Sequence, residues 1–155
     1  MKVLIIYCSE YRKHTEKIAQ VFAKTIDCDI VNIKESMNLN IENYDLVGFG
    51  SGVYRESLHH KLYKLVEGLD LRGKNTFVFS TNGVGMKFYN NDLIKLIESK
   101  GGIIKGSFAC KGSFSPSEFT DNRIFDFMGK LSYGHPNEKD FRKADVFIKE
   151  LMSSL

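Results

Sequence analysis

Cysteine is scarce in this chain, and the cysteines present do not pair off. Cys8, Cys28 and Cys110 make an odd number without a C-x-x-C spacing, so neither a disulfide framework nor a zinc site is indicated. No apolar run approaches the roughly 18 residues that a membrane span needs, and the first residues do not have the pattern of a leader peptide. We therefore expect a cytoplasmic protein with no membrane span.

A strong charge of either sign is also missing. The formal net charge is +3, the sequence pI is about 8.7, and no run of lysine or arginine exceeds two residues. This charge is far below that of a typical nucleic-acid-binding protein, so we expect no nucleic-acid partner. The hydrophobic fraction of 43% allows 155 residues to bury a core, and we expect one domain over residues 1–155.

Apolar bursts alternate with helical periods along the chain. The expected strands are residues 2–7, 29–33, 45–50, 75–80 and 103–109, the last with the alternation of a sheet edge. The expected helices begin near Thr15, near Leu58, near Leu93 and after Asn137, which can cap the last helix. Because parallel neighbours need long crossovers, this order predicts a three-layer α/β/α sandwich around a five-stranded parallel sheet.

Three polar or glycine-bearing segments follow strands of this predicted sheet. In open parallel sheets, ligands bind beyond the carboxyl ends of the strands, where the strand order reverses. The segment from Ser9 to Thr15 joins a strand to a helix, so its backbone N–H groups and the helix dipole favour a bound phosphate. A solvated basic turn without a ligand is the alternative.

These segments resemble the flavodoxin family. S-E-Y-R-K-H-T-E-K-I-A at 9–19 is similar to the flavodoxin phosphate loop, with Thr15 and Ala19 at the family's interval, although it is one residue longer and lacks glycine. G-S-G-V-Y at 50–54, S-T-N-G-V-G at 80–85 and G-H-P-N-E-K-D at 134–140 resemble a short-chain branch whose loop carries histidines. The resemblance covers nearly the whole chain. It implies a flavodoxin-like fold with strand order 2-1-3-4-5 and one FMN.

The resemblance also implies which residues hold FMN. Around the phosphate they are Ser9, Glu10, Tyr11, Arg12, Lys13, His14 and Thr15. Against the flavin ring they are Ser51, Gly52, Val53 and Tyr54 from a loop expected at 50–56, where glycines admit a flat ring and Tyr54 can stack on it. At the pyrimidine-like end of the ring they are Thr81, Asn82, Gly83, Val84 and Gly85. Core packing of Tyr54 and an ordinary tight turn at 81–85 are the alternatives.

Other site chemistries fail on particular residues. Cys8 occupies the place of the nucleophilic cysteine of a tyrosine phosphatase, which needs an Arg six residues later to hold the phosphoryl group. Position 14 is His instead, so we expect Cys8 to be a small buried hydrophobe. No G-x-G-x-x-G follows the first strand, so the ordinary dinucleotide-binding fingerprint is absent. His59 and His60 are adjacent, so we expect them to point to different helix faces, with no carboxylate or cysteine to complete a metal set.

We expect a protein that shuttles electrons between redox partners through FMN. The alternatives are a flavin-dependent oxidoreductase resembling the menaquinone-linked protoporphyrinogen oxidases and an NAD(P)H-dependent quinone or flavin reductase. The expected partner is an unidentified redox protein, and the expected state is a monomer or a weak dimer. In residues 111–136 Asp121 can cap a short helix, and the stretch either closes over the site, meets a redox partner or forms a packed excursion before the last helix.

Overall fold

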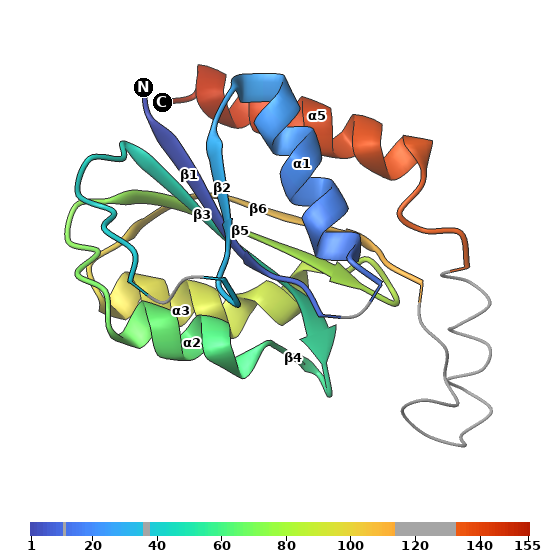
Figure 1. Cartoon of the computed structure of the whole chain (residues 1–155), viewed down its shortest axis with the longest axis horizontal. Helices are drawn as coiled ribbons and strands as arrows, with labels where there is room; N and C mark the ends of the chain where they lie inside the picture. The colour runs from blue at the N-terminus through green and yellow to red at the C-terminus, as the bar shows by residue number, and fades with distance from the viewer. Residues whose placement is uncertain (11, 36–37, 114–132) are drawn as a thin grey trace.

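Five parallel strands form the central sheet of the structure, a computed structural model that describes all residues except 11, 36–37 and 114–132 (Figure 1). They are β1 (Val3–Cys8), β2 (Asp29–Asn32), β3 (Leu46–Tyr54), β5 (Asn75–Asn82) and β6 (Ile103–Lys111). Their order is β2-β1-β3-β5-β6. The two-residue strand β4 (Ser57–Leu58) pairs antiparallel with the end of β3. The predicted order 2-1-3-4-5 is confirmed, because β4 takes no place in the parallel path.

Strand β1 is central because all six of its residues are apolar enough to be covered on both faces. Every residue of β1 is buried, and Ile5 pairs with Ile30 on one side and with Gly48 on the other. Cys8 is fully buried at the end of this strand, as expected. Strand β6 lies at one end of the sheet, which confirms the edge predicted from its alternating pattern.

Helices cover both faces of the sheet. On one face lie α1 (His14–Ile26) and α5 (Glu138–Ser153); on the other lie α2 (His60–Glu67) and α3 (Asn91–Ser99) (Figure 1). The short 3-10 helix η1 (Lys87–Asn90) leads into α3. Phe22 of α1 packs edge-on against Phe79 of β5 in one core cluster, with ring centroids 5.2 Å apart. Asn137 caps α5 through a capping box, as predicted. No helix in the described part of the chain is long and apolar enough to cross a bilayer.

The prediction of a loop at 50–56 is wrong for residues 50–54, which belong to strand β3. Strand β3 runs on to Tyr54 and turns into β4 through Arg55 and Glu56, which both have positive φ angles, 49° and 71°. The strand expected at 45–50 therefore stops short of the observed end of β3 at Tyr54. A Cβ on Gly50 would lie 2.2 Å from the Phe79 ring, so this glycine admits a core side chain rather than a ligand. Likewise, β5 includes Thr81 and Asn82. The predicted helix cap at Asp121 lies outside the described residues.

Candidate functional site

The predicted phosphate segment meets the ends of β3 and β5 at the carboxyl edge of the sheet. The hydroxyls of Thr15 and Thr81 form a buried hydrogen bond of 2.9 Å, which ties the first turn of α1 to β5. The backbone N–H of Glu10 donates to the Tyr54 hydroxyl at 3.4 Å. The fold therefore brings together the three segments that the sequence predicts.

The start of α1 has backbone donors and no side-chain cap. Lys13 occupies the cap position in the left-handed conformation, and its side chain makes no capping hydrogen bond. The N–H of Lys17 is bonded to the carbonyl of Lys13, so the N–H groups of residues 14–16 precede the first intrahelical bond. By contrast, His59 caps α2 and Asn137 caps α5 through their side chains. An anion at α1 would satisfy the open donors and lie at the positive end of the helix dipole.

Ser9 adds a side-chain donor to the same segment. Its side chain is buried, with 7% of its surface exposed, and its hydroxyl has no hydrogen-bond partner among the described residues. A buried hydroxyl without a partner is unfavourable, so such a group in a native fold indicates a missing partner. The Ser9 hydroxyl and the uncapped start of α1 together fit a phosphate group.

The basic side chains of this segment divide into two kinds. Arg12 and Lys13 are exposed and have positive φ angles of 50° and 54°. His14 is half-buried, and its Nε2 lies 3.0 Å from both the carbonyl and the hydroxyl oxygen of Ser113. Burial lowers the pKa of His14, although the Ser113 bond opposes this shift. His14 therefore ties the segment to the residues after β6 rather than offering a fixed cation.

Residues 51–54 serve the fold more than the sequence suggests. The Ser51 hydroxyl accepts a hydrogen bond from the His59 backbone N–H at 2.9 Å and donates to the Gly52 carbonyl at 2.6 Å. Val53 pairs with Leu58 in the hairpin. Tyr54 is half-buried, with its ring edge-on to His59 at a centroid distance of 5.1 Å. Tyr54 remains the candidate ring contact of this segment.

Asn82 shapes the segment after β5 and has little left for a ligand. Its side-chain oxygen accepts from the N–H groups of Val84 and Met86, and its Nδ2 donates to the Met86 carbonyl at 3.1 Å. The Gly85 N–H donates to the Asn82 carbonyl, and Gly85 has a φ of 69°. The N–H groups of Val84 and Gly85 are therefore used within this turn. Gly83 is left as the candidate backbone donor to the flavin ring.

A carboxylate and a cysteine lie beside His59, although the sequence indicated neither to complete a metal set. One possible ligand atom each from Cys8, Glu10 and His59 lie within 4.8 Å of one another. The rings of His59 and His60 also stack, at 4.5 Å, because His59 precedes α2 as its cap instead of lying on a helix face. No pattern in the sequence indicates this cluster, because the end of β1 and the start of α2 meet only through the fold.

The chemistry of this cluster favours ion pairing over a cation. The Nδ1 of His59 accepts from the Lys61 N–H at 3.1 Å, so Nε2 carries the proton that faces Glu10 at 3.2 Å. Burial raises the pKa of the Cys8 thiol to about 11, which keeps it protonated and speaks against a phosphatase nucleophile as well. The Glu10 carboxylate also pairs with Lys34 at 3.3 Å. Burial favours protonation of Glu10, but its bonds to Lys34 and His59 lower its pKa overall.

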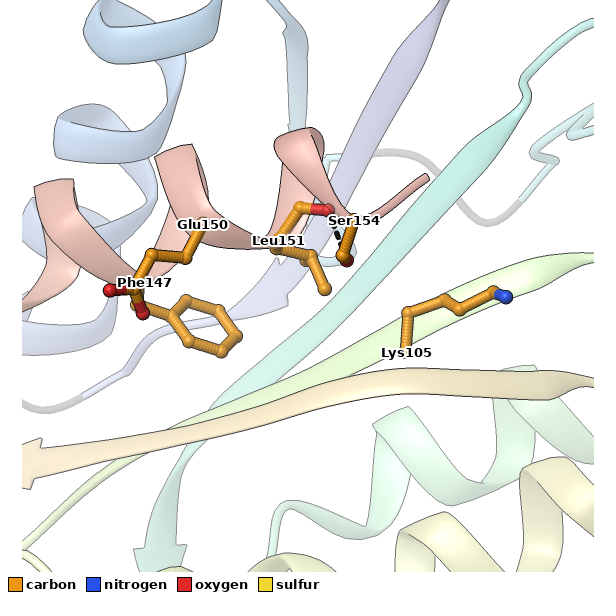
Figure 2. Close-up of a pocket in the computed structure, with 5 residues that line it drawn as sticks. All are labelled: Lys105, Phe147, Glu150, Leu151 and Ser154. Atoms are coloured by element: carbon orange, nitrogen blue, oxygen red, sulfur yellow. Dashed lines mark hydrogen bonds between the residues drawn. The ribbon is translucent and has the colours of Figure 1, made fainter.

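A surface pocket lies away from these residues. It is lined by Phe147, Glu150 and Leu151 of α5, by Ser154 directly after that helix, and by Lys105 near the start of β6 (Figure 2). These residues lie toward the amino end of the sheet, opposite Ser9 and Tyr54. None of the predicted site residues lines this pocket.

Comparisons with known proteins agree with the fold. A family model for the flavodoxin domain matches residues 4–135. The chain is 38% identical over 156 residues to the uncharacterized protein MJ0298 of Methanocaldococcus jannaschii, covering 99% of this chain and 100% of that protein.

Solved structures show the same fold at low sequence identity. Oxidised flavodoxin 2 from Bacillus cereus aligns with a TM-score of 0.68 and 17% identity, covering all of both chains. A flavoprotein from Lactobacillus acidophilus, solved in complex with FMN, aligns with a TM-score of 0.56 and 18% identity, covering 68% of this chain and 91% of that one.

Proposed function

The chain belongs to the flavodoxin domain family, and from that premise we propose that it binds one FMN noncovalently and carries electrons between redox partners. The bound flavin would supply the electron chemistry. The observation that carries the proposal is the buried Ser9 hydroxyl, which lacks a partner among the described residues and shares a segment with the uncapped start of α1. FMN in the similar Lactobacillus acidophilus flavoprotein supports the same cofactor here.

The protein's part is to hold the phosphate and the ring. The Ser9 hydroxyl and the N–H groups of residues 14–16 would donate to the phosphate, and the exposed Arg12 and Lys13 would add positive charge. The Thr15–Thr81 bond fixes this segment against β5. Tyr54 would cover the ring, and Gly83 would offer a backbone donor to its edge.

A carrier fits the described side chains better than a turnover enzyme. Burial keeps Cys8 as a thiol, and His59 bridges Glu10 and the Lys61 N–H. None of these groups is placed to act as a free acid, base or nucleophile. The cysteines are free thiols, which suits a reducing compartment, so the cytoplasm is part of the proposal.

The test is the flavin content of the purified protein. We expect a yellow protein that releases about one FMN per chain on denaturation, or a colourless one that regains this content when FMN is added. Neither NADH nor NADPH alone should bleach the flavin of a carrier, and a porphyrinogen or quinone should not be turned over. Rapid bleaching or turnover would favour the enzyme alternatives, whereas a colourless protein that ignores FMN would refute the proposal.

A further inference from the structure

Two large apolar side chains are exposed beside the segment that follows β5. Met86 exposes 51% of its surface and Phe88 exposes 50%, and they flank Lys87 in sequence. The Asn82 side chain binds both the N–H and the carbonyl of Met86, so this residue is fixed at the rim of the candidate site. A cluster of exposed apolar groups at a functional rim is typical of a docking surface.

Charged residues from two other segments lie near the stretch from Gly85 to Phe88. We call the whole set the 86–88 surface; its residues are Arg55, Glu56, Met86, Lys87, Phe88 and Lys111. Strand β4, next to the Arg55–Glu56 turn, packs against η1. Glu56 of this turn also lies near enough to Tyr89 of η1 to act on it. Burial raises the pKa of the Tyr89 hydroxyl, and the Glu56 charge adds to this effect. On the other side, a Cβ on Gly85 would lie 3.1 Å from the Cγ of Lys111.

The 86–88 surface is positively charged. It has three basic residues and one acidic residue, and none of the three bases forms an ion pair within the described part of the chain. Arg55 and Lys87 are exposed, so their charge is available to steer an approaching molecule. Glu10, the acidic residue of the phosphate segment, is instead paired with Lys34 and His59.

We propose that the 86–88 surface docks an acidic electron-transfer protein, a proposal that rests on the proposed function. Charge complementarity would select an acidic partner and speed the encounter, while Met86 and Phe88 would form the small apolar centre of a transient interface. During each encounter one redox centre loses one electron and the other gains it, and no bond in either protein forms or breaks. The surface adjoins Gly83 and Gly85, so a docked partner lies next to the candidate flavin site.

Binding to two redox proteins of opposite charge tests this proposal. The probes are an acidic plant-type [2Fe–2S] ferredoxin and a basic cytochrome c, titrated against the FMN-loaded protein by calorimetry. We expect ferredoxin to bind and cytochrome c not to, and ferredoxin affinity to fall as salt rises from about 20 mM to about 200 mM. Tighter binding of cytochrome c, or no binding of ferredoxin at low salt, would overturn the proposal.

Matched variants locate the interface. Lys87→Glu should weaken ferredoxin binding by about tenfold at low salt, and Phe88→Ser should weaken it at every salt concentration. Lys24→Glu reverses an exposed charge in the last turn of α1, at the opposite edge of the sheet, and should leave binding unchanged. Equal weakening by Lys24→Glu and Lys87→Glu would contradict the assignment.

Two controls separate this proposal from its alternatives. Flavin absorbance of each sample reports FMN binding directly, so a failure of the proposed function is seen before any probe is added. Sedimentation of the protein alone tests a second copy of the chain as the occupant. If the original protein is a dimer that Phe88→Ser dissociates, the proposal is overturned. If the original protein is a monomer and binds ferredoxin, the proposal is supported.

Discussion

Replacing Ser9 with alanine should keep or raise the stability of the flavin-free protein but weaken its affinity for FMN. In the flavin-free protein the Ser9 hydroxyl is buried and has no partner among the described residues. Burying such a group costs about 1–3 kcal/mol, so removing it should leave the free energy of unfolding unchanged or raise it by about 1 kcal/mol. In the complex, the same hydroxyl would donate to a charged phosphate.

The loss of that bond sets the expected change in affinity. A hydrogen bond to a charged group contributes about 1.5–3 kcal/mol, which corresponds to roughly a ten- to hundredfold weaker FMN affinity for Ser9→Ala. Urea unfolding without flavin measures the first effect, and quenching of flavin fluorescence on titration measures the second. A less stable variant that binds FMN as tightly as the original protein would refute the reasoning.

Thr76→Val is the matched control for this substitution. Thr76 is fully buried, but its hydroxyl donates to the Ile103 carbonyl at 3.1 Å near the amino ends of the strands, away from the candidate site. Removing the hydroxyl leaves that carbonyl short of a partner, so we expect a loss of about 1–2 kcal/mol in stability. FMN affinity should not change. The two variants thus give opposite patterns if Ser9 faces the phosphate.

Two further predictions concern stability. Gly50→Ala should lower the free energy of unfolding in urea by about 1–3 kcal/mol, because the new Cβ would lie 2.2 Å from the buried Phe79 ring. Gly68→Ala, whose nearest contact is 3.5 Å, should be nearly neutral. Equal losses of stability in the two variants would contradict this packing. Burial lowers the pKa of His14 and His59 below the unfolded value of 6.5, so the unfolded chain binds more protons and stability should fall as pH drops below 6.5. A His14→Gln/His59→Gln variant should show a flatter profile between about pH 7 and pH 5.

The fold was predictable because its signals are local. The continuous apolar run of β1 and the four-residue periodicity of Ile18 and Phe22 each define an element within a short window, and alternation of strands with helices then fixes the sheet. The meeting of the three predicted segments followed, because the carboxyl ends of parallel strands share one edge.

The details that the sequence did not reveal depend on distant contacts. Gly50 lies inside β3 because a phenylalanine from the neighbouring strand fills the space above it. The pairing of Glu10 with His59 joins β1 to the start of α2, and no pattern in either segment indicates it. Asn82 reads as a ligand contact in isolation, whereas its side chain is used by the turn that follows. Whether the predicted residues hold FMN stays a prediction.

The most direct test of the central claim compares FMN with riboflavin, which has the same ring system but no phosphate. If the Ser9 hydroxyl and the uncapped start of α1 bind the phosphate, two or more charge-assisted hydrogen bonds are lost with riboflavin. FMN should then bind at least about a hundredfold more tightly than riboflavin in matched titrations. Equal affinities for FMN and riboflavin would contradict the account.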